Sequence, residues 1–183
     1  MHIEETEFEG LYVIHLEKKG DDRGWFMRTF DLKLFKENIS SFSGQWKQMN
    51  HSFNAQKGTF RGLHYQEAPF QEAKCVRCIS GAVIDYALDL RENSSTFLEV
   101  FEIELSAKNK NMIFIPKGFA HGFFTLEDNS ELVYLHDEFY QPDFDRGVYY
   151  KDEIIKTKID ITPQVISEKD KNYKRIEFFF KGI

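Results

Sequence analysis

Short runs of strand-forming residues, separated by turn residues, dominate the hydrophobic pattern of the chain. The runs are LYVIHL (11–16), GWFMRTF (24–30), WKQMNHSF (46–53), TFRGLHYQ (59–66), AKCVRCI (73–79), AVIDYALDL (82–90), FLEVFEIEL (97–105), NMIFIP (111–116), HGFFTL (121–126) and ELVYLHD (131–137). Closely spaced strands with few helices are typical of a β-sandwich or β-barrel. We therefore expect a mainly β fold that forms one domain over residues 1–183, with the cluster KKGDDRG (18–24) as a turn.

Two of these runs alternate cleanly between their two faces. In residues 82–90, Asp85 and Asp89 share a face, which either meets solvent or lines a polar cavity. In residues 97–105, Glu102 and Glu104 share a face that we expect to be solvated.

One segment, DLKLFKENI (31–39), is a good helix candidate, with Asp31 as its N-cap and Leu34 and Phe35 on its apolar side. From about residue 153 the chain becomes more charged, and we expect this final stretch to wrap the outside of the fold.

Composition and charge narrow the function classes. The chain is 42% hydrophobic, enough for a sizeable core, and its net charge of −6 is spread out without a basic arm, so binding of nucleic acid by charge alone is not expected. No apolar run approaches the roughly 20 residues that span a bilayer. The acidic N-terminal segment MHIEETEFEG lacks the apolar core of a signal peptide. We expect a cytoplasmic protein without membrane contact.

The two cysteines, Cys75 and Cys78, form a C-x-x-C pair. Zinc sites need four ligands, and a second cysteine pair is absent from the sequence. The pair lies in a predicted strand, where positions three apart face opposite sides. We interpret both residues as structural thiols.

Two short motifs carry histidines at a characteristic spacing. The first runs from Gly58 to His64 and Gln66, and the second from Pro116 to His121. This pair resembles the two motifs of the cupin superfamily, whose fold is a small double-sheet β-barrel. The predicted fold is thus a cupin-type jelly roll with a short helix near the N-terminus and a C-terminal wrapping segment.

Metal-binding cupins supply H-x-H and a glutamate from the first motif, where this chain has Gln66 instead of the second histidine. Gln71 stands near the acidic position, and Glu72 lies one residue off. An amide is a poor transition-metal ligand compared with imidazole. We expect a site that carries out acid–base chemistry without a metal. The alternative is a metal site built from two histidines and Glu72, which is displaced by one residue.

Longer segments resemble one family more closely. They are DDRGWF (21–26), QMNHSFNAQKGTFRGLHYQ (48–66), QEAKCVR (71–77), IPKGFAHGFFTL (115–126), ELVYLHDEFYQP (131–142) and ISEKD (166–170), in the family's order and spacing. The resemblance is to the dTDP-4-dehydrorhamnose 3,5-epimerase family. It implies an isomerase of dTDP-rhamnose and polysaccharide biosynthesis that inverts C3, C5 or both in a nucleotide-linked 4-keto-6-deoxy sugar.

Such a reaction removes the proton on a carbon next to the C4 ketone and returns a proton to the opposite face of the resulting enolate. It needs a base that titrates near neutral pH, an acid across the ring, and a cation or donor for the developing oxyanion. Because the substrate already carries its keto group, we expect no cofactor.

The family pattern implies four catalytic residues. His64 matches the base, because histidine titrates near neutral pH, and Asp170 matches the carboxylate that orients it. Asp85 is a second candidate partner for His64. Tyr134 matches the acid, and Lys74 matches the residue that stabilises the enolate oxygen.

Other matches concern substrate binding. A guanidinium makes bidentate charged contacts with phosphate, an aromatic face stacks on a base, and an amide reads a base edge. The matches are Arg23 and Arg61 near the sugar and diphosphate, Phe26, Gln48 and Asn50 on the nucleoside side, and Tyr140 in the sugar pocket. We interpret His121 as a structural histidine, and we give Asp145 less weight as a site residue.

The chain departs from the family pattern at several positions. Arg28 stands where the family usually has a glutamate near the nucleotide, which leaves the base and the nucleotide class open. Asn54 replaces a usual serine, and Leu135 replaces a common lysine. These changes indicate a divergent member, with another sugar or a single inverted centre as alternatives.

Family members are similar in being homodimers whose N-terminal strands complete the partner's pocket. The resemblance therefore implies that Arg23 and Phe26 serve the other subunit, through a large and fairly apolar interface. Three other functions stay open for the same residues. They are a 3,4-keto-isomerase on the same substrates, a non-catalytic sugar-nucleotide-binding cupin, and a metal-dependent cupin dioxygenase.

Overall fold

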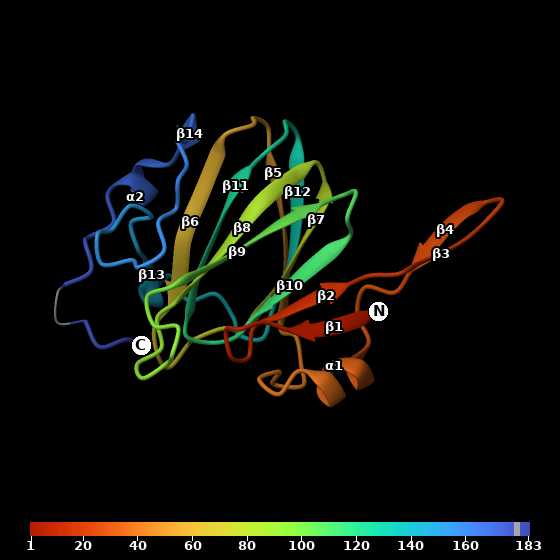
Figure 1. The fold of residues 1–183 in the computed structure, drawn as a ribbon, viewed down its shortest axis with the longest axis horizontal. Coiled ribbons are helices and arrows are strands. Elements are labelled where there is room, and N and C mark those ends of the chain that lie inside the picture. The colour runs from red at the N-terminus through yellow and green to blue at the C-terminus, as the bar shows by residue number, and fades with distance from the viewer. Residues whose placement is uncertain (178–179) are drawn as a thin grey trace.

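Two facing β-sheets build the protein, whose computed structural model describes residues 1–177 and 180–183 (Figure 1). The strands are β1 His2–Glu5, β2 Tyr12–His15, β3 Lys18–Asp21, β4 Gly24–Met27, β5 Gln48–Asn54, β6 Thr59–Gln66, β7 Lys74–Ser80, β8 Ala82–Asp89, β9 Val100–Ser106, β10 Asn111–Ile115, β11 Phe119–Thr125, β12 Ser130–His136, β13 Asp145–Gly147 and β14 Val165–Ile166. The helices are α1 Leu32–Asn38, the 3₁₀ turn η1 Pro142–Phe144, and α2 Glu168–Lys171.

The first sheet has the strand order β1-β2-β10-β7-β12-β5, and the second has the order β13-β6-β11-β8-β9. Neighbours in these orders are antiparallel, while β14 adds to β6 in parallel. This arrangement confirms the expected double-sheet barrel. Strands β3 and β4 form a separate hairpin that projects far from the barrel (Figure 1).

The barrel core lies where the inner faces of the two sheets meet. Val76 and Leu132 from the first sheet pack in one cluster with Val83 and Phe123 from the second. Side chains from two facing sheets interdigitate in this way because each strand alternates its inward and outward positions. A barrel so filled on one side leaves its polar cavity confined to the other.

The two cysteines lie on opposite faces of β7, as expected. Cys75 packs in a cluster with Phe35 and Phe114, whereas Cys78 belongs to the barrel core. Burial raises the pKa of both thiols, that of Cys78 to about 11, so both stay protonated at neutral pH.

Helix α1 begins as the sequence predicts. The Asp31 carboxylate accepts hydrogen bonds from the backbone N–H groups of Lys33 and Leu34 at 3.1 and 3.3 Å, which caps the first turn. Phe35 is fully buried, where it meets Phe42 edge-on. The aromatic side chains around it fix the helix against the first sheet.

The C-terminal segment covers the outer face of the second sheet. Ile155 and Ile159 pack with Tyr86 and Leu88, so strand β8 is buried on both faces. Asp85 and Asp89 are therefore fully buried, and Asp89 is not a cavity residue because Arg91, Ser94 and Thr96 bind its carboxylate. Glu102 and Glu104 on β9 are exposed as expected.

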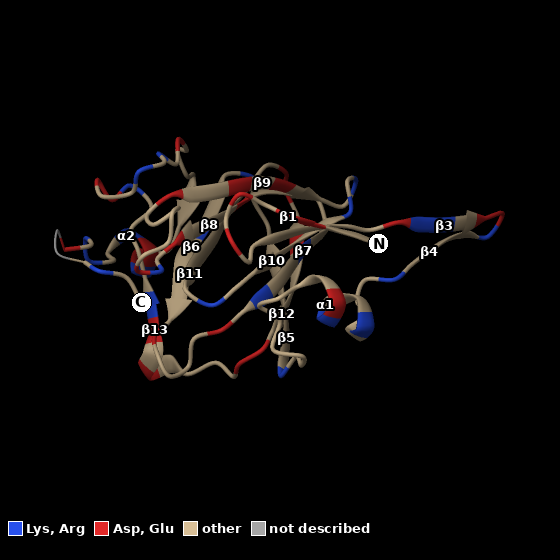
Figure 2. Ribbon diagram, turned by 60° about the horizontal axis from the view of Figure 1, so that its bottom comes forward, with Lys and Arg blue, Asp and Glu red and all other residues tan. Residues whose placement is uncertain are grey.

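Some elements were not predicted. KKGD forms strand β3 instead of a turn, because its register with β4 makes the hairpin even though its side chains are all exposed. Strands β1, β13 and β14 and helix α2 also escape the hydrophobic pattern, because each is very short. Acidic and basic side chains are interspersed over the fold (Figure 2), and no helix among the described residues could span a bilayer.

The packing makes a prediction about stability. Leu105→Ala, which empties a fully buried site in the barrel core, is expected to lower the free energy of unfolding by about 2–5 kcal/mol. Leu32→Ala, at a position that is 44% exposed, serves as the matched control and should change it by less than about 0.5 kcal/mol. Urea unfolding would measure both, and equal losses would contradict this account of the core.

Candidate active site

A polar cavity of about 320 Å³ lies between the two sheets. Its walls come from β5, β6, β7, β11 and β12 and from the loop before β13. The lining residues are Asn50, His51, Ser52, Arg61, His64, Tyr65, Gln66, Glu72, Lys74, His121, Phe123, Tyr134, His136, Tyr140 and Asp145. The cavity thus gathers most of the residues singled out in the sequence.

His64 on β6 forms a hydrogen bond with Asp170 on α2, 106 positions further along the chain. Nε2 of His64 lies 2.7 Å from Oδ1 of Asp170, and the backbone N–H of Gly62 donates to Oδ2 at 3.4 Å. Burial alone would raise the pKa of Asp170, but the hydrogen bond and charge of His64 outweigh it and lower the pKa. A carboxylate accepts only, so Nε2 carries the proton and Nδ1 keeps the lone pair. An imidazole oriented in this way can act as a base.

The end of the chain secures this dyad. The hydroxyl of Ser167 accepts the backbone N–H of Asp170 at 3.0 Å, which caps the short helix α2. The ring of Tyr173 meets the His64 ring edge-on at 5.8 Å. Gly147 permits this approach, because a Cβ there would lie 2.2 Å from the Tyr173 ring.

Asp85 pairs with His121, and not with His64, for which the sequence left it as a second candidate partner. Its two oxygens lie 3.0 and 2.9 Å from Nε2 of His121. Asp85 is fully buried, and its pKa is raised by that burial. Because Asp85 serves His121, Asp170 alone is the carboxylate partner of His64. His121 has a buried partner, as expected of a structural histidine, but it also lines the cavity.

Tyr134 reaches the cavity from β12, in the sheet opposite His64. Its hydroxyl lies 3.0 Å from the hydroxyl of Ser52. Burial raises the pKa of the Tyr134 phenol far above its ordinary value, so the phenol keeps its proton at neutral pH. The side chain can therefore act only as an acid toward a strong base, such as the carbon of an enolate.

Lys74 lies at the start of β7, with its side chain 7% exposed. Its ammonium is 2.8 Å from Oε1 of Glu72, and Oε2 of Glu72 is 2.9 Å from Nδ1 of His136. Lys74 is therefore nearly shielded from water and lines the cavity. His136 was missed by the sequence analysis, although its spacing of two from Tyr134 on a strand places both side chains on one face.

Of the two predicted nucleoside-side amides, Asn50 lines the cavity, and Gln48 donates to Asn50 from beside it. The backbone N–H of Tyr140 donates to Gln48 at 2.9 Å, and the Tyr140 hydroxyl donates to Asp145 at 3.0 Å. Arg61 faces the cavity and donates from Nε to Asn54 at 2.8 Å. Asn54, a departure from the family pattern, thus orients a cationic side chain.

The side-chain amide of Gln66 is bonded to the backbone and is not placed as a metal ligand. Its amide donates to the backbone oxygen of Phe70 at 2.9 Å and accepts the backbone N–H of Gln141 at 2.6 Å. Glu72, the displaced acid, is engaged with Lys74 and His136. Within residues 1–177 and 180–183, no group of three or more His, Cys, Asp or Glu side chains is placed to hold a metal ion.

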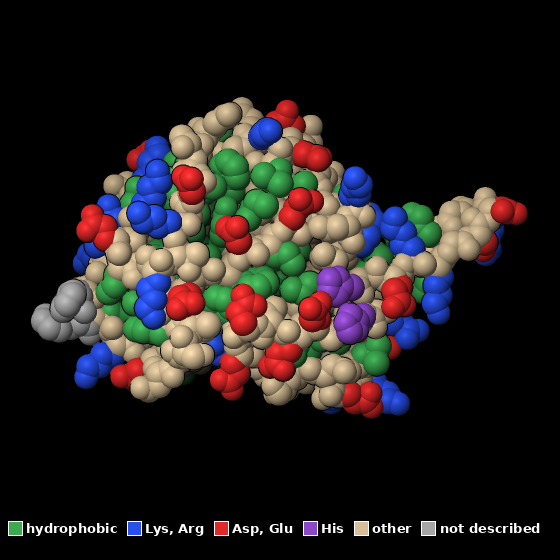
Figure 3. All heavy atoms as spheres, in the orientation of Figure 1, with side chains coloured by type: hydrophobic (Ala, Val, Ile, Leu, Met, Phe, Trp, Pro, Cys, Tyr) green, Lys and Arg blue, Asp and Glu red, His purple; other side chains and the backbone are tan. Residues whose placement is uncertain are grey.

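Arg23 and Phe26 lie outside this cavity. Both belong to the projecting β3–β4 hairpin (Figure 3), where Phe26 is 70% exposed and Arg23 pairs with Asp21. The cavity of one chain therefore lacks both residues. Arg28 is also away from the cavity and forms an ion pair with Asp31 at 2.7 Å.

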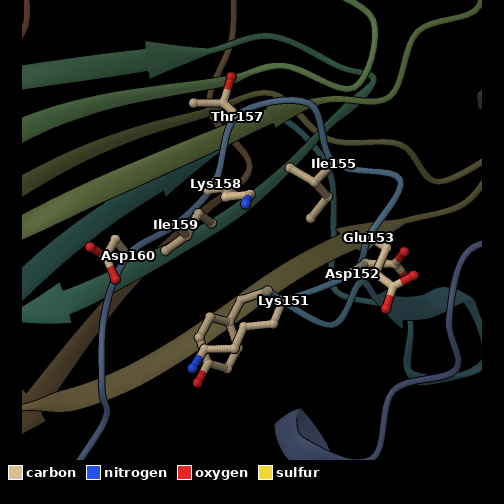
Figure 4. Close-up of a pocket in the computed structure, with 9 residues that line it drawn as sticks. Lys151, Asp152, Glu153, Ile155, Thr157, Lys158, Ile159 and Asp160 are labelled. Atoms are coloured by element: carbon tan, nitrogen blue, oxygen red, sulfur yellow. The ribbon is translucent and has the colours of Figure 1, made fainter.

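A second hollow of about 500 Å³ lies in the C-terminal wrapping segment, between Tyr150 and Asp160 (Figure 4). Its lining includes Lys151, Glu153 and Lys158, with Ile155 and Ile159. Histidine is absent from the lining residues that the structure describes there. The polar cavity between the sheets is therefore the better candidate for acid–base chemistry.

A comparison with protein-family models decides the family. The model described as dTDP-4-dehydrorhamnose 3,5-epimerase matches residues 5–177. The chain belongs to the dTDP-4-dehydrorhamnose 3,5-epimerase family. The resemblance seen in the sequence is confirmed, and with it the assignment to the epimerases, which are isomerases.

Individual members of the epimerase family cover nearly the whole chain. The dTDP-4-dehydrorhamnose 3,5-epimerase of Shigella flexneri is 39% identical over 172 residues, 94% of each protein. The Bacillus anthracis enzyme, solved with TDP and pyrophosphate bound, has a TM-score of 0.89 at 34% identity and covers 96% of this chain and 99% of its own. The Legionella pneumophila enzyme, solved in complex with dTDP-4-keto-L-rhamnose, has a TM-score of 0.88 at 34% identity and covers 95% and 92%.

The dyad makes a prediction about pH. The folded-state pKa of Asp170 lies below its unfolded value of about 3.9, so its contribution to stability is complete above that value and is lost as pH falls. The difference in unfolding free energy between wild type and Asp170→Asn should therefore be fully present above about pH 4 and shrink below it. Urea unfolding from about pH 5 to 3 would measure it, and a difference that grows as the pH falls below about 4 would contradict the assigned ion pair.

Proposed function

We propose that this protein inverts C3 and C5 of dTDP-4-dehydro-6-deoxyglucose, giving dTDP-4-dehydrorhamnose. The observation that carries the proposal is the pair of opposed groups in the cavity. His64, bonded to Asp170, stands on one sheet, and the protonated Tyr134 stands on the other. A sugar ring between them meets a base on one face and an acid on the opposite face, which is what inversion requires.

In the proposed reaction, Nδ1 of His64 takes the proton from the carbon next to the C4 ketone. Asp170 stabilises the imidazolium that forms, because its carboxylate is already bonded to Nε2. The electron pair of the C–H bond moves into the enolate, whose oxygen becomes negative. Lys74 provides the cation for that oxygen from a nearly dry site, where a charge acts more strongly than in water.

Tyr134 then donates its phenolic proton to the opposite face of the enolate carbon. The raised pKa of the phenol does not prevent this step, because an enolate carbon is a stronger base than a phenolate. Ser52, bonded to the hydroxyl, is placed to stabilise the phenolate that remains. The opposed walls favour inversion over a 3,4-keto-isomerase, which needs a proton moved along one face of an enediol.

Recognition of the nucleotide is assigned to the cavity rim. Arg61 supplies a guanidinium toward the diphosphate, and Gln48, Asn50 and Tyr140 supply amides and an aromatic ring toward the sugar and the nucleoside. The bound states of the Bacillus and Legionella relatives support a dTDP-linked substrate.

We further propose a homodimer in which the β3–β4 hairpin completes the partner's cavity. The support is its projection from the barrel and the exposure of Phe26 and Trp25, at 70% and 54%, which a monomer would leave in water. Arg23 would then add a second guanidinium to the partner's diphosphate site. The single-domain organisation and cytoplasmic location expected from the sequence stay predictions.

Replacement of the base tests the proposed chemistry. In D₂O, wild type should introduce deuterium at C3 and C5 of dTDP-4-dehydro-6-deoxyglucose, and His64→Asn should slow this exchange by about 10²–10⁴-fold. Proton NMR measures the exchange. His15→Asn is the matched control, since His15 pairs with Glu4 and Asn111 outside the cavity. Equal loss in both variants, or no exchange with wild type, would contradict the proposal.

Mixed dimers test the crossing hairpin. An Arg23→Ala/Phe26→Ala variant and the His64→Asn variant should each be nearly inactive alone. After co-refolding, heterodimers should regain one working site, because one cavity then has both an intact base and an intact partner hairpin. Activity of the mixture above the sum of the two parts is the expected result. Full activity of the hairpin variant alone would show that the hairpin does not serve the site.

A further inference from the structure

Among the residues that the structure describes, Glu72 is the one cavity carboxylate that bonds two other titratable cavity residues from two different strands. Oε1 is 2.8 Å from the ammonium of Lys74, and Oε2 is 2.9 Å from Nδ1 of His136. The side chains of Glu72, Lys74 and His136 are 12%, 7% and 10% exposed, so this trio is nearly shielded from water. A shielded charge is costly unless it is paired, and this geometry pairs it.

The orientation of each polar group in this network follows from its neighbours. The Tyr140 backbone N–H donates to Oε1 of Gln48, so the Gln48 amide nitrogen points to Oδ1 of Asn50, 3.4 Å away. The Asn50 nitrogen then donates to Nε2 of His136 at 3.3 Å. In this orientation Nε2 of His136 accepts from Asn50, and Nδ1 donates to Glu72.

Within the trio, the negative charge of the Glu72 carboxylate is paired with the ammonium of Lys74, and His136 adds a hydrogen bond. Burial alone would raise the pKa of Glu72, but the Lys74 charge and the His136 hydrogen bond bring it well below its ordinary value. An ammonium has three N–H donors, and the one aimed at Glu72 fixes the directions of the other two.

From this geometry we propose that Glu72 is a positioning residue, which keeps the ammonium of Lys74 charged and directs it toward the substrate oxygen. His136 holds Oε2 of Glu72 in place by its hydrogen bond. The inference rests on the proposed epimerase function, because it assigns Lys74 the enolate oxygen. Glu72 touches no reacting atom; it acts through Lys74. The other titratable side chains that line the cavity are Arg61, Asp145, Tyr65 and Tyr140 with His51, His64, His121 and Tyr134, and buried Asp85 lies behind His121.

The test compares wild type with Glu72→Gln, which keeps the shape of the side chain and removes its charge. The variant is expected to lose about 100-fold in kcat for deuterium exchange, since a small displacement of a catalytic group has that effect, while KM changes little. The alkaline limb of its kcat profile should also move to lower pH, because an ammonium buried without its carboxylate loses its proton more readily. Glu72→Asp, which restores the charge at a shorter reach, should recover part of both effects.

A second readout is independent of activity. Labelling of Lys74 by acetic anhydride, followed by mass spectrometry across pH, reports when its amine becomes unprotonated. The labelling midpoint should shift to lower pH in Glu72→Gln and less so in Glu72→Asp, which also serves if the glutamine variant does not fold. Glu99→Gln, at an exposed Lys156 pair, is the matched control and should behave as wild type.

The outcomes separate the two proposals. No exchange by wild type, with a shifted labelling midpoint in Glu72→Gln, would overturn the epimerase function and keep the role of Glu72 toward Lys74. Normal exchange by wild type, with unchanged kcat and labelling midpoint in a folded Glu72→Gln, would overturn the inference. A fall in kcat that follows only the loss of folded protein, with the midpoint unchanged, would show a purely structural role and would also overturn it.

Discussion

The hydrogen bond between His64 and Asp170 is the contact on which the rest of the site depends. It joins a barrel strand to a helix at the far end of the chain, so it can form only when the C-terminal segment has wrapped over the second sheet. The wrapping is driven by burial of isoleucines such as Ile155 and Ile159. Hydrophobic packing on the outside of the barrel thus positions the carboxylate that orients a base on the inside.

The barrel supplies a second constraint, which is the separation of the proposed base and the proposed acid on opposite walls. Strands β6 and β12 belong to different sheets, so His64 and Tyr134 line the cavity from opposite sides. Burial keeps Tyr134 protonated, and Asp170 is bonded to Nε2 of His64. Both features follow from the positions of these residues in the fold. A substrate that already carries a ketone needs little more than these two groups and a cation for its oxygen.

Much of this arrangement could be predicted from the sequence, because it is local or follows a motif. Strand β6 has the bounds of the strand-forming run at 59–66, and Asp31 caps helix α1 as expected. The choice between Asp85 and Asp170 could not be made from the pattern, because both contacts join distant segments and depend on how the sheets close. The pairing of Glu72 with His136 could not be predicted for the same reason. It depends on the register between strands β7 and β12, which places His136 opposite Lys74.

The proposal that His64 and Tyr134 act on opposite faces of the sugar is tested most directly by Tyr134→Phe. Proton NMR in D₂O would follow deuterium entry at C3 and C5 of dTDP-4-dehydro-6-deoxyglucose together with the configuration of each carbon. This variant should still exchange the proton, because His64 can remove and return it on one face, while inversion nearly stops. Loss of exchange and inversion in equal measure, or inversion at the wild-type rate, would contradict the claim.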